Sequence, residues 1–172
     1  MDIIAAILSF LALACLIIST LIKGDKIKTI LFLVFMGNLL YSISYFMTDS
    51  MSGAGSCLLG AIISIINYFI TKTGKPIPKA LLIVYSLAFV IMNLSTGGFT
   101  PQGIIAVLAT LAFVMRVAQK NGAKYRLWTV ANVLGWILYD IATFAYGAMI
   151  THLVQLGITF VGMVIYDRKK EI

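Results

Sequence analysis

The chain has 172 residues, of which 61% are hydrophobic and only 11% are charged, and its mean hydropathy is +1.03. A soluble domain has about 45–50% apolar and about 25% charged residues, so this composition excludes a soluble globular protein and indicates an integral membrane protein. The net charge of +7 does not indicate a nucleic-acid-binding protein, because the cations stand in short clusters between apolar runs, as in the loops of membrane proteins.

Seven apolar runs are long enough, or nearly so, to cross a bilayer as helices, which takes roughly 20 residues for about 30 Å of hydrocarbon. In chain order they are Ile3–Ile22, Ile27–Met47, Ala54–Thr71, Ala80–Leu94, Gly103–Ala118, Leu127–Tyr146 and Ala148–Tyr166. The first run lacks a basic leading region and a small-residue cleavage site, so it predicts a retained span and not a signal peptide. Cys15 and Cys57 lie inside apolar runs, where buried free thiols are expected more than a disulfide or a metal site.

The positions of Lys and Arg predict the orientation of the chain. All thirteen lie on the connections that follow the first, third, fifth and seventh runs. Those after the fifth run are Arg116, Lys120, Lys124 and Arg126. The other side carries Asp2 and Asp49 and no cation. Because cytoplasmic loops are enriched in Lys and Arg, we expect the N-terminus outside and the C-terminus in the cytoplasm. Only an odd number of spans gives this pattern, which supports seven.

A weak internal repeat suggests two related halves. With Asn38 placed over Asn132, an offset of 94 residues (132 − 38 = 94), six of the seventeen pairs from 38 to 54 are identical. The topology agrees, since the first three and the last three spans each begin outside and carry a basic loop after their first helix. We therefore expect an all-α membrane protein with two parallel three-helix bundles, 1–71 and 100–172 (with a short basic tail), joined by a linker helix within 72–99. This is one plan of secondary transporters.

Several segments resemble the bacterial inner-membrane YgjV family. They are Gly135-Trp-Ile-Leu-Tyr-Asp140, Tyr146-Gly147-Ala148 and Tyr166-Asp167-Arg168, with Gly53-Ala54 and Ile62–Asn67 in the first half. That family is distantly similar to the SWEET, semi-SWEET and PQ-loop proteins, which carry sugars, amino acids or other small solutes through paired three-helix bundles. The resemblance implies a SWEET-like 3+1+3 arrangement, in which Asn67 and Trp136 match an asparagine and a tryptophan of the solute site.

The sequence departs from those relatives in one respect. They have a proline in the first helix of each unit, where it acts as a hinge. Here the first span has no proline, and Pro101-Gln102 stands only at the outer edge of the fifth span. The resemblance therefore implies the 3+1+3 arrangement of helices but not a hinge at a proline.

Polar residues form stripes on four predicted helices, since residues three and four apart share a helix face. The stripes are Asn38, Ser42 and Tyr45; Ser56, Gly60, Ser64 and Asn67; Asn132, Trp136, Asp140 and Thr143; and His152, Gln155 and Thr159. Such faces suit a bundle around a small wet cavity. The alternative is that these Ser, Thr and Asn residues join membrane helices by hydrogen bonds. The pairs Trp128/Trp136 and Tyr41/Tyr45 include expected interface anchors, and only Trp136 is taken as a site candidate.

Asp140 and His152 are the most informative polar residues. A charged residue at the centre of a membrane helix costs roughly 2.5–3.5 kcal/mol on the insertion scale and is by default a functional residue with a partner. Both residues lie at similar depth on neighbouring antiparallel helices, about 10 Å and 7.5 Å from Gly147 by helix rise. A hydrogen-bonded pair is expected if their faces meet, and it would suit proton coupling because histidine changes charge between about pH 5 and 8. The alternative is an acid that only locks the two helices together.

These observations favour a small carrier for a polar solute such as a sugar, an amino acid or a vitamin-like metabolite. The candidate solute site comprises Asn38, Asn67, Asn132, Trp136, Asp140, His152 and Gln155. We expect a monomer or homodimer in the bacterial cytoplasmic membrane. We expect no nucleic-acid partner and no enzymatic activity, cofactor or metal ion, because no catalytic, metal-ligating or phosphate-binding spacing occurs.

The alternative function is that of a non-transporting accessory or immunity protein that binds another membrane protein. Such a protein would use an outward face of small residues, for which the first span offers Ala5, Ala6, Ala12 and Ser19. A carrier would instead depend on inward residues such as Asn67, Trp136 and Asp140.

Overall fold

The structure, a computed structural model, describes residues 3–49 and 51–167, and this part of the chain contains seven α-helices and no strand. The helices are α1 (Ile3–Leu21), α2 (Ile27–Met47), α3 (Met51–Lys72), α4 (Lys79–Gly97), α5 (Pro101–Val117), α6 (Gly122–Ala142) and α7 (Tyr146–Tyr166). Asp2 and the three C-terminal cations Arg168, Lys169 and Lys170 lie outside the described residues.

Five of these helices, α1 to α4 and α7, are long and apolar enough to cross a membrane. The other two depart from that pattern in different ways. α5 is apolar but has only 17 residues, and α6 carries Lys124, Arg126 and Asp140 among its 21 residues. The all-helical, membrane-spanning class predicted from composition is therefore confirmed.

The bounds of α6 differ most from the predicted apolar run, Leu127–Tyr146. The helix begins five residues earlier, at Gly122, because the Asn121 side chain accepts a hydrogen bond from the Ala123 backbone N–H at 2.8 Å and so caps the first turn. It ends at Ala142, and Phe144, whose φ is 58°, reverses the chain before α7. Hydropathy alone placed the start after the charged residues, although these belong to the helix.

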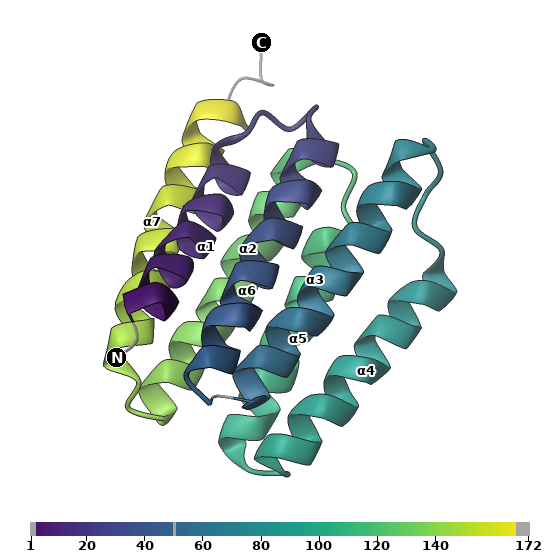
Figure 1. The fold of residues 1–172 in the computed structure, drawn as a ribbon. Helices are drawn as coiled ribbons and strands as arrows, with labels where there is room; N and C mark the ends of the chain where they lie inside the picture. The colour runs from purple at the N-terminus through teal and green to yellow at the C-terminus, as the bar shows by residue number, and fades with distance from the viewer. Residues whose placement is uncertain (1–2, 50, 168–172) are drawn as a thin grey trace.

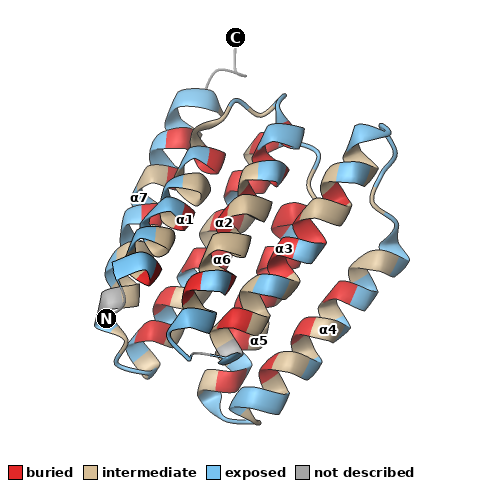
Figure 2. Ribbon diagram, in the orientation of Figure 1, coloured by how far each residue is buried: buried red, intermediate tan, exposed pale blue. Residues whose placement is uncertain are grey.

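The helices form two rows, with α1, α2 and α3 in one row and α7, α6 and α5 in the other (Figure 1). Helices that are consecutive in the chain pack side by side within each row, and α1 packs against α7 at one edge. At the opposite edge α4 packs mainly against α5 and has few contacts with α3. Figure 2 shows buried residues mainly on the faces between neighbouring helices and exposed residues mainly on the outward faces.

The close-packed apolar core occupies one end of the bundle. Its members come from the N-terminal half of α2, the C-terminal halves of α3 and α5, the start of α6, and α4. They are Ile27, Ile30, Leu31, Val34, Ile63, Tyr85, Phe89, Phe113, Val114, Val117 and Tyr125. The N-terminal half of α1 and the C-terminal half of α2 contribute nothing to this cluster. Packing is therefore uneven along the helix axes.

The same end is closed by close backbone contacts. A Cβ atom on Gly122 would lie only 2.3 Å from the Gly24 Cα, and one on Gly162 would lie 2.6 Å from the Thr20 carbonyl oxygen. Larger residues do not fit at either position without movement of the backbone. The α1–α2 connection thus packs directly on the start of α6, and α7 on the end of α1.

Arg126 joins three helices at this closed end, and its predicted place in a loop is wrong. The side chain is 1% exposed within α6, and its Nε donates to Asp167 Oδ2 at 3.0 Å while Nη2 donates to Oδ1. Nη1 donates to the Ile22 carbonyl oxygen at 3.1 Å. An arginine can lie inside the bundle here because a carboxylate and carbonyl groups satisfy its donors.

Candidate functional site: a polar cavity at the open end

A cavity of about 900 Å³ occupies the end of the bundle away from the core, and all seven helices contribute to its lining. At this end its lining reaches the α2–α3, α4–α5 and α6–α7 connections, with Thr48, Gly97 and Ala145. Its lining on α5 extends from Gln102 to Arg116, which is about 21 Å of helix rise. The cavity therefore reaches from one end of the bundle to the edge of the apolar core.

Asp140 and His152 form a direct pair in the wall of this cavity. His152 Nδ1 lies 2.6 Å from Asp140 Oδ2, and the Asp140 side chain is 4% exposed, while that of His152 is 25% exposed. The contact is an ion pair when the histidine is protonated and a hydrogen bond from Nδ1–H when it is neutral. Helix rise predicts a similar depth for both residues, and the structure shows that their helix faces meet.

The turn between α6 and α7 sets the geometry of this pair. The Ala145 backbone N–H donates to the Asp140 carbonyl oxygen at 2.8 Å, which closes the end of α6 tightly. Phe144, with its positive φ, then reverses the chain so that α7 returns along α6. The Trp136 ring stacks on the imidazole of His152, with 6.3 Å between centroids and 14° between planes. The imidazole of His152 is thus positioned by Asp140 at Nδ1 and by the Trp136 ring on one face.

Three amides that were predicted to belong to the site also line the cavity: Asn38, Asn132 and Gln155. Asn38 Nδ2 donates to the Val34 carbonyl oxygen at 2.8 Å, and Asn132 Nδ2 donates to the Ala109 carbonyl oxygen at 2.8 Å. Both asparagines thus bind a backbone carbonyl and also face the cavity. The helix-bridging and solute-facing interpretations, which the sequence left open, are compatible for Asn132.

Asn67 lies away from the other six candidates. Its Nδ2 donates to the Val117 carbonyl oxygen at 3.1 Å, and the Tyr85 hydroxyl donates to its Oδ1 at 3.3 Å. The side chain is fully buried and joins α3, α4 and α5 at the closed end. The structure therefore brings together Asn38, Asn132, Trp136, Asp140, His152 and Gln155, while Asn67 has the contacts of a residue that holds helices together.

Tyr41 and Tyr45 are cavity residues that the sequence analysis set aside as interface anchors. Both line the cavity, and their rings stack at 5.9 Å with 19° between planes. Their spacing of four residues already placed them on one helix face. The missing information was the direction of that face, which depends on how α2 packs.

Arg116 is the principal residue that sequence reasoning missed. It was assigned to a cytoplasmic loop, but it belongs to the last turn of α5, is 2% exposed, and lines the deep end of the cavity. Its Nη1 donates to Asn132 Oδ1 at 3.2 Å. One signal was present in the sequence: Arg116 lies inside the apolar run Gly103–Ala118, whereas Lys120, Lys124 and Arg126 follow that run.

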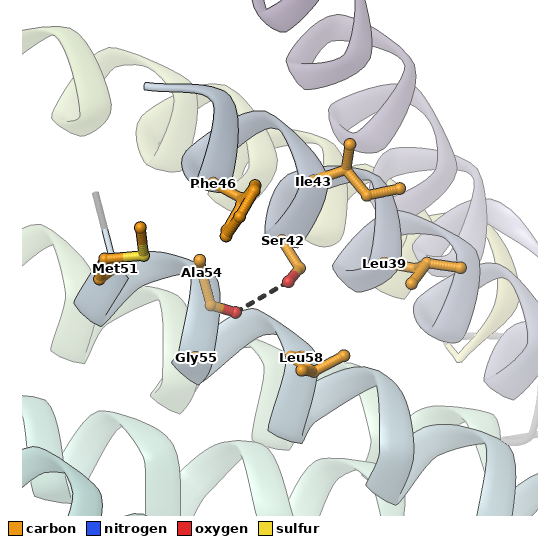
Figure 3. A pocket seen from close by; sticks show the side chains of 8 residues that line it. All are labelled: Leu39, Ser42, Ile43, Phe46, Met51, Ala54, Gly55 and Leu58. Carbon is orange, nitrogen blue, oxygen red and sulfur yellow. Dashed lines mark hydrogen bonds between the residues drawn. The ribbon is translucent and has the colours of Figure 1, made fainter. Parts of the chain in front are cut away.

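A second, smaller hollow of about 410 Å³ lies between α2 and α3 (Figure 3). Seven of its eight lining residues are apolar or glycine, and the eighth, Ser42, donates to the Ala54 carbonyl oxygen at 2.9 Å. Its hydrogen-bonding group is therefore already occupied by the protein. This hollow offers no free polar group to orient a solute, so the large cavity remains the candidate site.

A helical bundle with membrane-spanning helices and an internal polar cavity defines a multi-pass membrane protein. The model of the Imp-YgjV family, described as bacterial inner membrane protein, matches residues 3–170. The chain belongs to this family, and its location is the bacterial inner membrane. A search of the curated proteins and a search of the solved structures each gave no match. The resemblance to SWEET proteins thus stays a prediction.

Proposed function

We propose that the protein is a small carrier that binds a polar solute in the large cavity. The observation that supports this most directly is the buried Asp140–His152 pair in the wall of a cavity of about 900 Å³. Sites for small molecules are clefts of roughly 300–1,000 Å³ in which a few placed polar groups orient the ligand. A pair that served only to lock α6 to α7 would not need a cavity beside it.

We also propose that the cavity opens to the outside of the cell. The cations of the connections α1–α2, α3–α4 and α5–α6 gather at the closed end of the bundle. They are Lys23, Lys26, Lys28, Lys72, Lys75, Lys79, Lys120 and Lys124. Among the described residues, the connections at the open end carry only the acid Asp49. The positive-inside rule then favours a cytoplasmic closed end.

The two rows of helices support a 3+1+3 arrangement within this carrier. α1 to α3 and α5 to α7 each pack in chain order, and α4 stands apart as a connector that lies on α5. Asn38 and Asn132, which are equivalent in the sequence repeat, line the same cavity from α2 and α6. Two related halves around one site would explain both facts.

Proton coupling through the Asp140–His152 pair is part of the proposal. The pair changes its net charge when the histidine gains a proton, in a wall that also meets the solute. The other titratable groups that line the cavity are Tyr41, Tyr45, Cys57, Tyr139 and Arg116. Of all these side chains, histidine is the type that changes charge near neutral pH.

A ligand screen on the purified protein in detergent tests the carrier proposal. Melting temperatures would be measured against sugars, amino acids, carboxylic acids and vitamins, at pH values on both sides of the range in which histidine titrates. A ligand at about 100 times its Kd stabilises by about 2.7 kcal/mol, which is a shift of several degrees. We expect Asp140→Asn to lose most of the shift and most of its pH dependence.

Asp49→Asn is the matched control, because it makes the same chemical change at an exposed residue that does not line the cavity. Asparagine also tolerates the positive φ of 55° found there. Equal shifts in wild type, Asp140→Asn and Asp49→Asn would place the ligand elsewhere. No shift with any compound would contradict the carrier proposal.

The face of α1 on which the accessory-protein alternative depended is not an exposed surface. The small-residue face of α1 was predicted to point outward, but Ala12 and Ser19 are fully buried. Ala5 and Ala6 line the cavity instead. The face is turned inward because small residues let α1 approach α2 closely: the Ser44 hydroxyl donates to the Ala5 carbonyl oxygen at 2.8 Å.

A further inference from the structure

Arg116 is a buried cation whose hydrogen-bonding capacity is only partly used. Rings cover the guanidinium group, with its carbon 5.3 Å from the centroid of Phe113 and 5.2 Å from that of Tyr125. Nη1 binds Asn132, whereas Nε and Nη2 have no hydrogen-bond partner within the described part of the chain. Buried charged donors without an acceptor are costly, so this arrangement calls for an acceptor from outside the chain.

The two unpartnered nitrogens form one edge of the guanidinium group. In Arg126 of the same bundle, the equivalent Nε and Nη2 both bind the carboxylate of Asp167, one oxygen each. This fork matches the spacing of the two oxygens of a carboxylate. Arg126 thus shows, within this protein, which chemical group fits the edge that Arg116 leaves unused.

No side chain of the cavity supplies that carboxylate to Arg116. Among the described residues, Asp140 is the only acid in the lining, and it is bound to His152. It also stands eight residues beyond Asn132, the partner of Arg116 on α6, which is about 12 Å of helix rise. The deep end of the cavity therefore carries a positive charge without a counter-charge from the lining.

We propose that Arg116 binds the carboxylate of the transported solute through its Nε–Nη2 edge, so that the solute is a small organic anion. This inference rests on the proposed carrier function and names the class of its solute. Both nitrogens are enclosed in this structure, so the guanidinium edge turns toward the cavity as the anion binds. Asn132 holds the other side of the guanidinium, and the rest of the solute extends toward Trp136 and Gln155.

The charge of the site favours an anion over a neutral solute. A sugar would leave the buried guanidinium without compensation, and a solute with only an amino group would add a second positive charge beside it. A buried charge left without a partner is strongly unfavourable, whereas a paired and hydrogen-bonded one is tolerated. A carboxylate satisfies both open donors and neutralises the charge in one contact.

Binding to the full-length protein in detergent tests this proposal with pairs of probes that differ only in charge. Acetate, lactate, succinate and benzoate would be compared with their amides, by calorimetry and by melting temperature. We expect at least one carboxylate to bind and its amide to bind at least about tenfold more weakly. Arg116→Lys keeps the charge without the fork and should weaken binding about tenfold, and Arg116→Gln should abolish it.

A spectroscopic measurement on the unaltered protein covers the case in which these variants fold poorly. The chain has three arginines, Arg116, Arg126 and Arg168, so Nε–H signals in an arginine-labelled sample are few. Addition of the carboxylate should shift the Arg116 signal and leave that of Arg126, which is already paired, unchanged. An unshifted Arg116 signal in the presence of a bound carboxylate would overturn the proposal.

The outcomes separate the two proposals. Binding of a sugar or an amide, with no carboxylate binding, would overturn the anion assignment and leave the carrier function standing. Tighter binding of inorganic phosphate than of any carboxylate would also overturn the carboxylate assignment. Absence of binding by every probe and by the broader solute screen would contradict the carrier function itself.

Discussion

Arg116 and Arg126 differ in what surrounds the same edge of the guanidinium group. In Arg126 that edge is filled by Asp167, and Nη1 reaches the end of α1. In Arg116 the edge has no acceptor among the described residues. One arginine thus has the contacts of a structural residue and the other those of a ligand-binding residue. The sequence predicts both as loop cations, because charge alone does not indicate what a side chain contacts.

Loss of the Asp167 carboxylate should destabilise the bundle. In Asp167→Ala, Arg126 remains buried without its counter-charge, and breaking a buried ion pair from one side typically costs about 3–5 kcal/mol. Because Asp167 is 20% exposed, we expect about 2–3 kcal/mol. Unfolding in a denaturing detergent would measure the change. Asp25→Ala, an exposed acid at the same end, serves as control, and equal stability of the two variants would contradict this role.

The Asp140–His152 pair shows which features of a contact can be predicted from the sequence and which cannot. Helix rise and the position of the turn gave equal depth for both residues from sequence alone. Rotation of each helix about its axis was not accessible, because it depends on the packing of α6 against α5 and of α7 against α1. The same unknown rotation explains why Tyr41 and Tyr45 were left out. Asn67 differs from the cavity residues in depth, since Ser56 and Gly60 of the same stripe line the cavity while Asn67 lies at the closed end.

At the scale of elements, α5 and α6 pack more closely than ordinary side chains allow. A Cβ atom on Gly135 would lie 2.8 Å from the Ala109 Cβ and 3.0 Å from its Cα. The short separation is what lets Asn132 reach the Ala109 carbonyl oxygen and, on its other side, hold Arg116. Glycine at this position therefore sets the geometry of the cavity floor through the spacing of two helices.

Gly135→Ala should move α5 and α6 apart. Overpacking of this kind costs about 1–3 kcal/mol, and we expect weaker ligand binding as well, because Asn132 and Arg116 shift together. Gly157→Ala on α7 is the matched control, since a Cβ atom there has no neighbour within 4 Å. That change should leave stability equal or raise it by about 0.5–1 kcal/mol. Melting temperatures would decide, and an unaffected Gly135→Ala protein would refute the close-packing argument.

At the scale of the molecule, the sequence predicted seven helical elements close to their observed positions. Apolar runs and charged breaks are local signals, and local signals locate helices well. The placement of the core at one end and of the cavity at the other depends on contacts between distant helices. Arg116, Tyr41 and Tyr45 illustrate the limit: their significance appears only when seven helices are assembled.

The proposed orientation of the whole molecule can be tested with single cysteines in a variant that lacks Cys15 and Cys57. Thr96 and Thr73 are exposed, at the open and the closed end respectively. We expect a membrane-impermeant maleimide to label Thr96→Cys in intact cells whose outer membrane has been made permeable. Thr73→Cys should react only after the inner membrane is opened. The reverse pattern would place the cavity mouth in the cytoplasm.

Because packing is uneven along the helix axes, the effect of a substitution should depend on its depth in the bundle. α2 and α6 each give one half to the apolar core and the other half to the cavity. The effect of a substitution on these helices thus depends more on the depth of the residue in the bundle than on which helix contains it. In the proposed orientation and function, substitutions at the cytoplasmic level should act on the amount of folded protein, and those at the outer level on the solute site. The proposal thus predicts that the solute could change while the closed end stays the same.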